Sequence, residues 1–95
     1  MDNNTSSIGD LIKVFFRKYK LEERLGEVDI RNNWEKIAGK LVAQHTLDLK
    51  LKNGKLILKL NSASLRHTLS FSKTEFVEKL NSSIGQNIIS DIELR

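Results

Sequence analysis

The first twenty residues of the chain carry hydrophobic side chains at the spacing of an amphipathic helix. They fall at i, i+3, i+4, i+7, i+8 and i+11, which is one face of a helix. These residues are Ile8, Leu11, Ile12, Phe15, Phe16 and Tyr19. Ser7, followed by an acidic residue in the first turn, predicts the N-cap, and residues 1–6 are expected to form a disordered tail. Segment 21–26 predicts a short turn or helical link that stops at Gly26.

A second helix is predicted from about Asp29, because apolar residues again share one helical face. These residues are Ile30, Trp34, Ile37, Ala38 and Leu41. Gly39 lies within this face, where it costs about 1 kcal/mol of helix propensity relative to alanine. A glycine at such a position indicates either the close approach of another backbone or a break in the helix.

Leucines alternate with polar residues on both sides of Asn53-Gly54, which predicts a β-hairpin with a type I′ loop. This loop pairs Lys52 with Lys55. The further cross-strand pairs that follow are Leu51–Leu56, Leu49–Leu58, Asp48–Lys59 and Leu47–Leu60. One face of the hairpin is leucine and the other is polar, so the sheet is expected to bury one side only.

The rest of the chain predicts a third helix and a closing strand. The helix begins at cap residues 61–64 and ends near Gly85. Its expected inner face comprises Leu65, Leu69, Ser72, Phe76, Val77 and Leu80. The segment IISDIELR alternates apolar and acidic residues, with Ile88, Ile92 and Leu94 expected inward. We therefore expect a single α+β domain over residues 7–95, in the order α-α-β-β-α-β, with helices covering one face of a three-stranded sheet. The order of the third strand in that sheet is left open.

Composition narrows the class of protein. The 95 residues include 16 Lys and Arg against 12 Asp and Glu, which gives a net charge of +4. Such a balance favours a polyanionic partner, although ordinary solubility explains it equally well. The absence of cysteine excludes disulfides and cysteine-ligated zinc. The N-terminal residues lack the features of a signal peptide, and no apolar run is long enough to span a membrane, so we expect a cytoplasmic protein.

Catalytic patterns find little support in the sequence. The two histidines, His45 and His67, have no metal-ligand spacing between or around them, and no cofactor is expected. There is no nucleophile elbow, and all five glycines are isolated, so there is no phosphate-binding loop. We therefore expect a binding protein rather than an enzyme.

A basic surface is predicted on the outward face of the hairpin and at the start of the third helix. The candidate phosphate-binding residues are Lys50, Lys52, Lys55, Lys59 and Arg66. Such residues hold phosphates without reading sequence, but lysines on an exposed hairpin also protect its edges from aggregation. Because the aromatic residues of the helices fall on predicted core faces, we expect no stacking platform for bases.

Two aromatic residues are candidates for contact with a protein partner. Trp34, the only tryptophan, has two interpretations: a core residue between the second helix and the sheet, or a partly exposed anchor for a partner. Phe71 lies between two serines, off the inner face of the third helix, and could contact a partner or a second copy of the chain.

Several segments together resemble a bacterial protein family. They are IGDLIKVFFRKYKLEERL, Trp34 with Ile37 and Gly39, His45-Thr46, LKNGKLILKLNSASLRHTL and LNSSIGQNIISDIELR. This combination is similar to the DciA-like family, formerly a domain of unknown function and loosely described as RNA-binding. The resemblance extends from about Ile8 to Arg95.

The resemblance implies a KH-like fold and a role in bacterial DNA replication. Members of the family engage the DnaB-type replicative helicase and help to place it on single-stranded DNA, without being ATPases themselves. By position, Trp34 would be the hallmark aromatic, and residues 62–69 would match the strand-to-helix junction. In two respects the chain departs from the pattern: it stops at the last strand, where many members continue into a disordered extension, and it lacks the GxxG loop of a KH cleft.

The sequence thus predicts a non-enzymatic adaptor that binds the replicative helicase and weakly contacts single-stranded DNA, or RNA, through basic side chains. No membrane contact is expected, and the oligomeric state is left open. The alternatives are a sequence-independent RNA-binding module and a homo-oligomeric scaffold that binds no nucleic acid.

Overall fold

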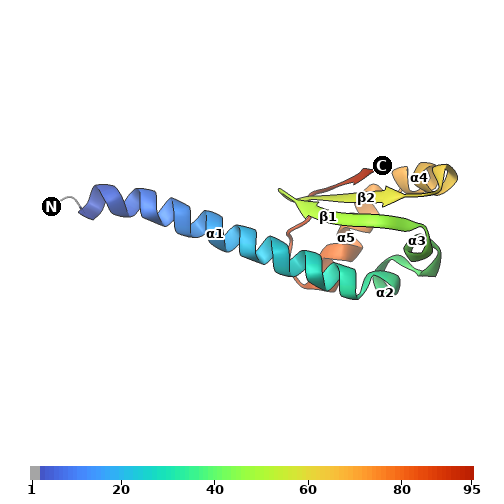
Figure 1. Cartoon of the computed structure of the whole chain (residues 1–95), viewed down its shortest axis with the longest axis horizontal. Helices are drawn as coiled ribbons and strands as arrows, with labels where there is room; N and C mark the ends of the chain where they lie inside the picture. Colours follow the sequence, from blue (N-terminus) through green and yellow to red (C-terminus); the bar gives the residue numbers. More distant parts are fainter. Residues whose placement is uncertain (1–2) are drawn as a thin grey trace.

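The computed structural model describes residues 3–95, with side chains from Ile8 onward. Its elements are α1 (Asn3–Asn32), α2 (Trp34–Ala38), α3 (Lys40–Gln44), β1 (Thr46–Lys52), β2 (Lys55–Leu60), α4 (Ala63–Ser70), α5 (Lys73–Ile84) and β3 (Asp91–Leu94). Helices precede a hairpin, further helices follow it, and a third strand completes the sheet (Figure 1). The expected α+β architecture, with its three-stranded sheet, is therefore confirmed.

Helix α1 is uninterrupted over 30 residues, so two expectations about it were wrong. Ser7 lies inside the helix rather than at its N-cap, and Gly26 does not stop it. Gly26 is instead buried: a Cβ atom there would collide with the side chain of Ile88. The glycine thus permits close packing within a continuous helix. The structure also assigns residues 3–6 to α1, where a disordered tail was expected; residues 1–2 lie outside the described part of the chain.

The second helix does not begin at Asp29 as predicted, because residues 29–32 are the last turn of α1, and its remainder is divided in two at Gly39. This residue has φ +92° and lies between α2 and α3. A Cβ atom there would meet nothing within 4 Å, so the glycine marks a break and not a close approach. The break changes the direction of the chain. As a result Leu41, expected on the inner face, is exposed, and Val42 is buried in its place.

The sheet has the order β1-β2-β3, with β1 and β2 antiparallel and β2 and β3 parallel. Positive φ angles at Asn53 (52°) and Gly54 (79°) agree with the predicted type I′ loop. The predicted register is confirmed from Lys52–Lys55 to Asp48–Lys59 but is wrong at Leu47. A register shift there pairs Thr46 with Leu60 and leaves the Leu47 side chain exposed.

The predicted third helix is also two helices, because residues 71–72 separate α4 from α5. Ser62 caps α4 as expected, and its hydroxyl accepts a hydrogen bond from the Leu65 amide at 3.2 Å. Gly85 ends α5 with φ +76°, also as expected. The closing strand is shorter than predicted, although Ile92 is buried within it.

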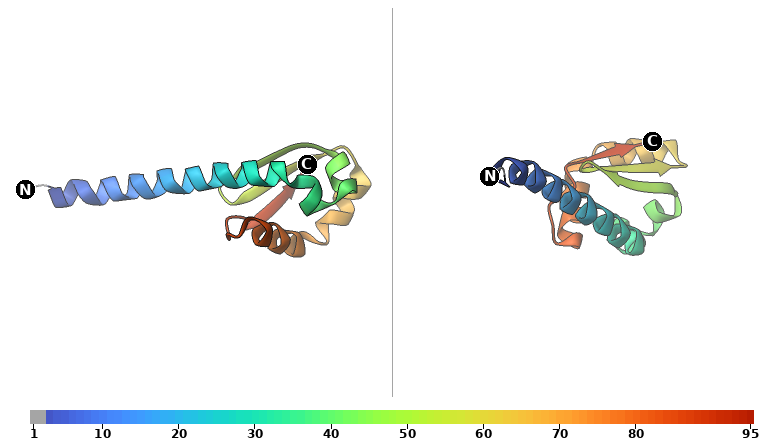
Figure 2. Two further views of the ribbon diagram at one scale, coloured as in Figure 1. Left: turned by 90° about the horizontal axis from the view of Figure 1, so that it is seen from below. Right: turned by 60° about the vertical axis from the view of Figure 1, so that its left-hand side comes forward.

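The hydrophobic core lies between the leucine face of the sheet and the helices. Figures 1 and 2 show the C-terminal half of α1, together with α2 and α5, along this one face. The fully buried core residues are Ile30, Leu56, Leu58, Leu80 and Ile92. The N-terminal half of α1 projects away from this body, so the molecule measures 61 × 21 × 20 Å. No helix in the described part is both long enough and apolar enough to cross a membrane.

Candidate nucleic-acid and partner interfaces

The four predicted phosphate-binding lysines are exposed on the outer face of β1 and β2. Carboxylates share this face, because Asp48 lies opposite Lys59, and Asp91 lies opposite Lys55. The Lys55 ammonium is 3.6 Å from a Glu93 carboxylate oxygen. The outer sheet face is therefore a mixed surface rather than a uniformly positive one, and this reduces its attraction for a polyanion.

Glu93 is held between cationic neighbours at the edge of the sheet. Its carboxylate accepts a hydrogen bond from the Arg95 guanidinium and is also close to Lys55. The hydrogen bond from Arg95 is the main cause that lowers the pKa of Glu93 below its ordinary value of 4.5. Glu93 is therefore charged at neutral pH.

Arg66, the fifth predicted phosphate-binding residue, has a structural contact. From α4, its guanidinium donates a hydrogen bond to the Leu60 carbonyl at 2.8 Å, and it lies 3.5 Å from the Arg95 carbonyl. Both carbonyls belong to strand ends. Arg66 thus fastens α4 to the sheet, and part of its donor capacity is already used.

A hollow of about 530 Å³ lies between α4 and β3, and it brings Lys and Arg side chains that are distant in sequence close to the Asp91 and Glu93 carboxylates. Lys55, Arg66, His67 and Lys73 line it, together with residues of β3. Lys73 was not among the predicted site residues, because a continuous third helix would not have placed it beside β3. Its position follows from the separation of α4 and α5, which no local pattern indicated.

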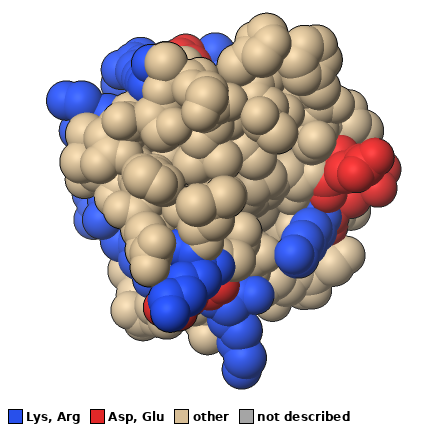
Figure 3. All heavy atoms as spheres, turned by 90° about the vertical axis from the view of Figure 1, so that its right-hand side faces the viewer, with Lys and Arg blue, Asp and Glu red and all other residues tan. Residues whose placement is uncertain are grey.

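Phe71 ends α4 and is 78% exposed, the most exposed of the large hydrophobic residues described. Its ring makes an edge-to-face contact with His67, with centroids 5.0 Å apart. Figure 3 views the end of the molecule at which α4 lies, and there a largely uncharged surface is bordered by Lys and Arg side chains and, at its right-hand edge, by Asp or Glu. Phe71 is therefore accessible to a partner.

Trp34 occupies the first of the two positions considered for it. Its side chain is 8% exposed and stacks on Phe76 at 5.8 Å. The indole N–H donates to the Thr46 hydroxyl at 2.9 Å, and that hydroxyl donates to the Val42 carbonyl at 2.7 Å. Trp34 thus joins α2, α3, β1 and α5, and it presents little surface to a partner.

The aromatic residues of α1 are not in the core, which corrects the expectation for that helix. Phe15 is 68% exposed, Phe16 59% and Tyr19 40%. They lie on the projecting half of α1, which extends past the hairpin (Figure 1). The spacing correctly predicted an apolar face, but not that the body of the domain would leave it uncovered.

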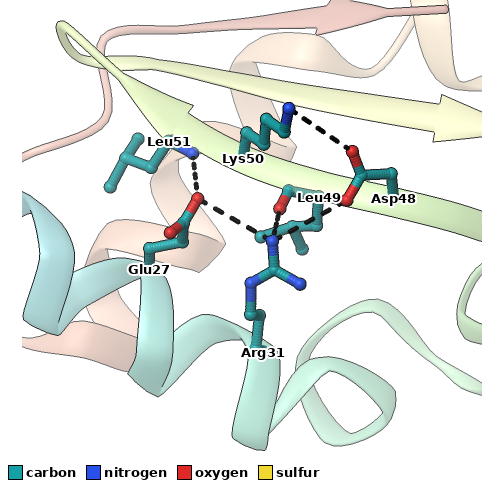
Figure 4. A network of polar contacts seen from close by, with 6 residues as sticks. All are labelled: Glu27, Arg31, Asp48, Leu49, Lys50 and Leu51. Carbon is teal, nitrogen blue, oxygen red and sulfur yellow. Dashed lines mark hydrogen bonds and ion pairs between the residues drawn. The ribbon is translucent and has the colours of Figure 1, made fainter.

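The other half of α1 is fixed to the hairpin by polar side chains (Figure 4). Glu27 accepts a hydrogen bond from the Leu51 amide at 2.8 Å, and Arg31 donates to the Leu49 carbonyl. Near the loop, the buried Glu23 accepts from the Gly54 amide at 3.1 Å. Glu27 and Arg31 thus occupy one N–H and one C=O group on the outer edge of β1, and α1 covers this part of the edge.

Catalytic chemistry has no visible support in the described residues. Among the side chains described, from Ile8 to Arg95, no group of three or more His, Cys, Asp or Glu is placed to hold a metal ion. His45 lies at the end of α3, and its Nδ1 is 2.7 Å from the side-chain oxygen of Asn61. It therefore joins the start of β1 to the end of β2, which is a structural role.

The chain shares sequence with known proteins over most of its length. The family model described as "Dna[CI] antecedent, DciA" matches residues 7–94. A UPF0232 protein of Corynebacterium glutamicum (strain R) is 26% identical over 65 residues, which are 68% of this chain and 36% of that protein. The chain thus spans about a third of the length of that relative. No solved structure gives a significant match. Because the family model covers all the elements from α1 to β3, the chain belongs to the DciA family.

Proposed function

We propose that this protein is a non-enzymatic adaptor, which binds the bacterial replicative helicase and assists its loading on single-stranded DNA in the cytoplasm. Membership of the DciA family over residues 7–94 is the observation that carries the proposal. The family is associated with helicase loading, and its description as an antecedent of Dna[CI] is in keeping with that association.

The hollow between α4 and β3 supports contact with the nucleic acid. Lys55, Lys73 and Arg66 line it, and the exposed Lys50, Lys52 and Lys59 extend the cationic surface over the sheet. Carboxylates within the same region limit the net charge. We therefore expect binding that is weak, independent of sequence and strongly reduced by salt.

The DNA contact can be tested by fluorescence anisotropy with a labelled single-stranded oligonucleotide, titrated at about 50–300 mM salt. We expect Lys55→Gln combined with Lys73→Gln to weaken binding and to reduce the salt slope by about 0.7 for each phosphate that the variant no longer neutralises. Lys36→Gln combined with Lys40→Gln, which removes two exposed lysines outside the hollow, is the matched control. Equal losses in both proteins would contradict a specific role for the hollow.

The adaptor role is tested with the replicative helicase of the same organism. We expect direct binding that persists at moderate salt, and more rapid unwinding of a forked DNA when the adaptor is present. Tighter binding to RNA than to DNA of the same sequence, without helicase binding, would favour an RNA-binding module instead. Self-association with neither helicase nor nucleic-acid binding would favour a scaffold.

A further inference from the structure

The projecting half of α1 extends away from the body of the domain. The hairpin loop reaches α1 at Lys20, whose ammonium donates to the Asn53 side chain at 3.1 Å. Towards the N-terminus, the described residues show no hydrogen bond or ion pair from segment 8–19 to another element. This segment extends beyond the sheet in both views of Figure 2.

The apolar face of this segment continues the face that packs in the core. Tyr19, Gly26 and Ile30 are separated by seven and four residues, so they lie on one side of the helix. Gly26 and Ile30 are buried against the domain, whereas residues 8–19 are exposed. The exposed members are Ile8, Leu11, Ile12, Phe15, Phe16 and Tyr19. A contiguous apolar surface of this kind is typical of an interaction site.

The charges of the segment indicate what covers this face. Segment 8–20 contains Asp10 and four cations: Lys13, Arg17, Lys18 and Lys20. A second copy of the chain would bring this cationic segment beside its equivalent, which is unfavourable. An acidic partner would gain from the same charges, so charge complementarity favours a different protein.

The short length of the segment favours a groove on the partner, rather than a flat surface, as its binding site. Thirteen helical residues extend about 20 Å, and two such helices side by side bury far less than the roughly 800 Å² per partner of a stable interface. A groove that encloses the helix covers both its apolar face and its flanks.

We propose that segment 8–20 of α1 docks, apolar face inward, into a hydrophobic groove of a protein partner whose rims carry Asp and Glu. The identity of the partner, the replicative helicase, rests on the proposed function. The new element is the surface of this chain that makes the contact and the kind of helicase surface that binds it. Phe15 and Phe16 are the expected anchors, because buried aromatic residues dominate such interfaces.

The test measures affinity for the helicase of the same organism by fluorescence anisotropy. Because the chain has no cysteine, Ser83→Cys on α5 gives a single labelling site far from the projecting segment. Leu11→Ala is compared with Leu47→Ala, since the two leucines are 55% and 58% exposed and only the first lies on the docking face. Phe15→Ala and Arg17→Glu complete the set, and circular dichroism verifies that each variant is folded.

We expect Phe15→Ala to weaken binding at least tenfold, Leu11→Ala and Arg17→Glu by several-fold, and Leu47→Ala by less than twofold. If the unsubstituted chain binds the helicase and all three α1 variants bind it with the same affinity, the docking inference is overturned, but the proposed function is not. No binding by the unsubstituted chain would overturn the proposed function together with it. A dimer in sedimentation that Phe15→Ala converts to a monomer would show that a second copy occupies the face, contrary to the inference.

Discussion

The Glu27 carboxylate on α1 accepts a hydrogen bond from the backbone N–H of Leu51 on β1, at 2.8 Å. This contact closes the outer edge of the sheet with a side chain instead of another strand. One turn to either side, Glu23 accepts from the Gly54 amide of the loop and Arg31 donates to the Leu49 carbonyl, so α1 follows the hairpin from its loop to Leu49. The opposite edge, β3, has no such cover among the described residues and faces the hollow lined by α4.

Loss of the Glu27 carboxylate is expected to destabilise the fold. Glu27→Ala leaves the Leu51 amide without its acceptor, which costs about 1–3 kcal/mol of unfolding free energy. Glu27→Gln retains an acceptor oxygen at the same position and should recover most of this loss. Urea unfolding followed by circular dichroism measures both variants. Equal destabilisation by the two would show that the charge of Glu27, and not its hydrogen bond, is responsible.

Substitution of Trp34 tests whether its side chain stabilises the core. Trp34→Phe removes the hydrogen bond to Thr46 and part of the packing on Phe76, so we expect a loss of about 1–3 kcal/mol. Phe71→Leu, at the most exposed hydrophobic position, should change stability by less than about 0.5 kcal/mol. Urea unfolding followed by circular dichroism gives both values. Helicase binding is then measured at a temperature where Trp34→Phe is folded. A loss of affinity of more than twofold would contradict a purely structural role for Trp34.

Phe71 is expected to contribute to a protein contact separate from that of α1. Phe71→Ala should leave stability unchanged, because its ring is exposed and touches only His67 among the described aromatic residues. If the end of α4 contacts the helicase, the variant weakens helicase binding, and the loss adds to that of Phe15→Ala because the two sites lie at opposite ends of the molecule. Unchanged affinity would remove Phe71 from the interface.

The sequence predicted those parts of the fold that local patterns determine. Asn53-Gly54 specified the hairpin and most of its register, and Ser62 and Gly85 marked helix ends correctly. The errors arose where tertiary packing overrode local preference. Gly26 was interpreted as a stop, yet it lies within α1 because Ile88 needs the space. Leu47 was assigned to the core, but the contacts of Thr46 introduce a shift that turns it outward.

The candidate sites could be predicted less completely from the sequence than the fold could. Periodicity showed that α1 has an apolar face, but it contains no information on whether another element covers that face. The five predicted phosphate-binding residues could be chosen by their charge. Only the structure shows that the four lysines are exposed on the sheet whereas Arg66 is bonded to the end of a strand, because this difference depends on contacts between segments distant in sequence. Lys73 joined the hollow only because α4 and α5 are separate helices.

Gly39 provides a test of the break between α2 and α3. Its φ of +92° with ψ of 160° is a conformation almost restricted to glycine, so Gly39→Ala should destabilise the fold by about 1–3 kcal/mol. Gly9→Ala is the control, because Gly9 lies within α1, where a Cβ atom would meet nothing within 4 Å, and alanine favours a helix. Urea unfolding should therefore show a loss for the first variant only. A loss in both would indicate that the substitution itself, and not the backbone conformation, is harmful.

The Arg95–Glu93 contact predicts how the edge strand responds to acid. Because the pKa of Glu93 is lower in the folded state than its ordinary value of 4.5, ionised Glu93 favours folding. This contribution is fully present above pH 4.5 and is lost as the pH falls through the lower, folded-state pKa. Arg95→Gln removes the principal cause of the shift and should return the pKa towards 4.5, whereas Lys55→Gln should have a smaller effect. Side-chain carboxyl chemical shifts followed by NMR between about pH 2 and 7 measure the pKa directly. A larger shift in Lys55→Gln than in Arg95→Gln would reverse the assignment of the principal partner.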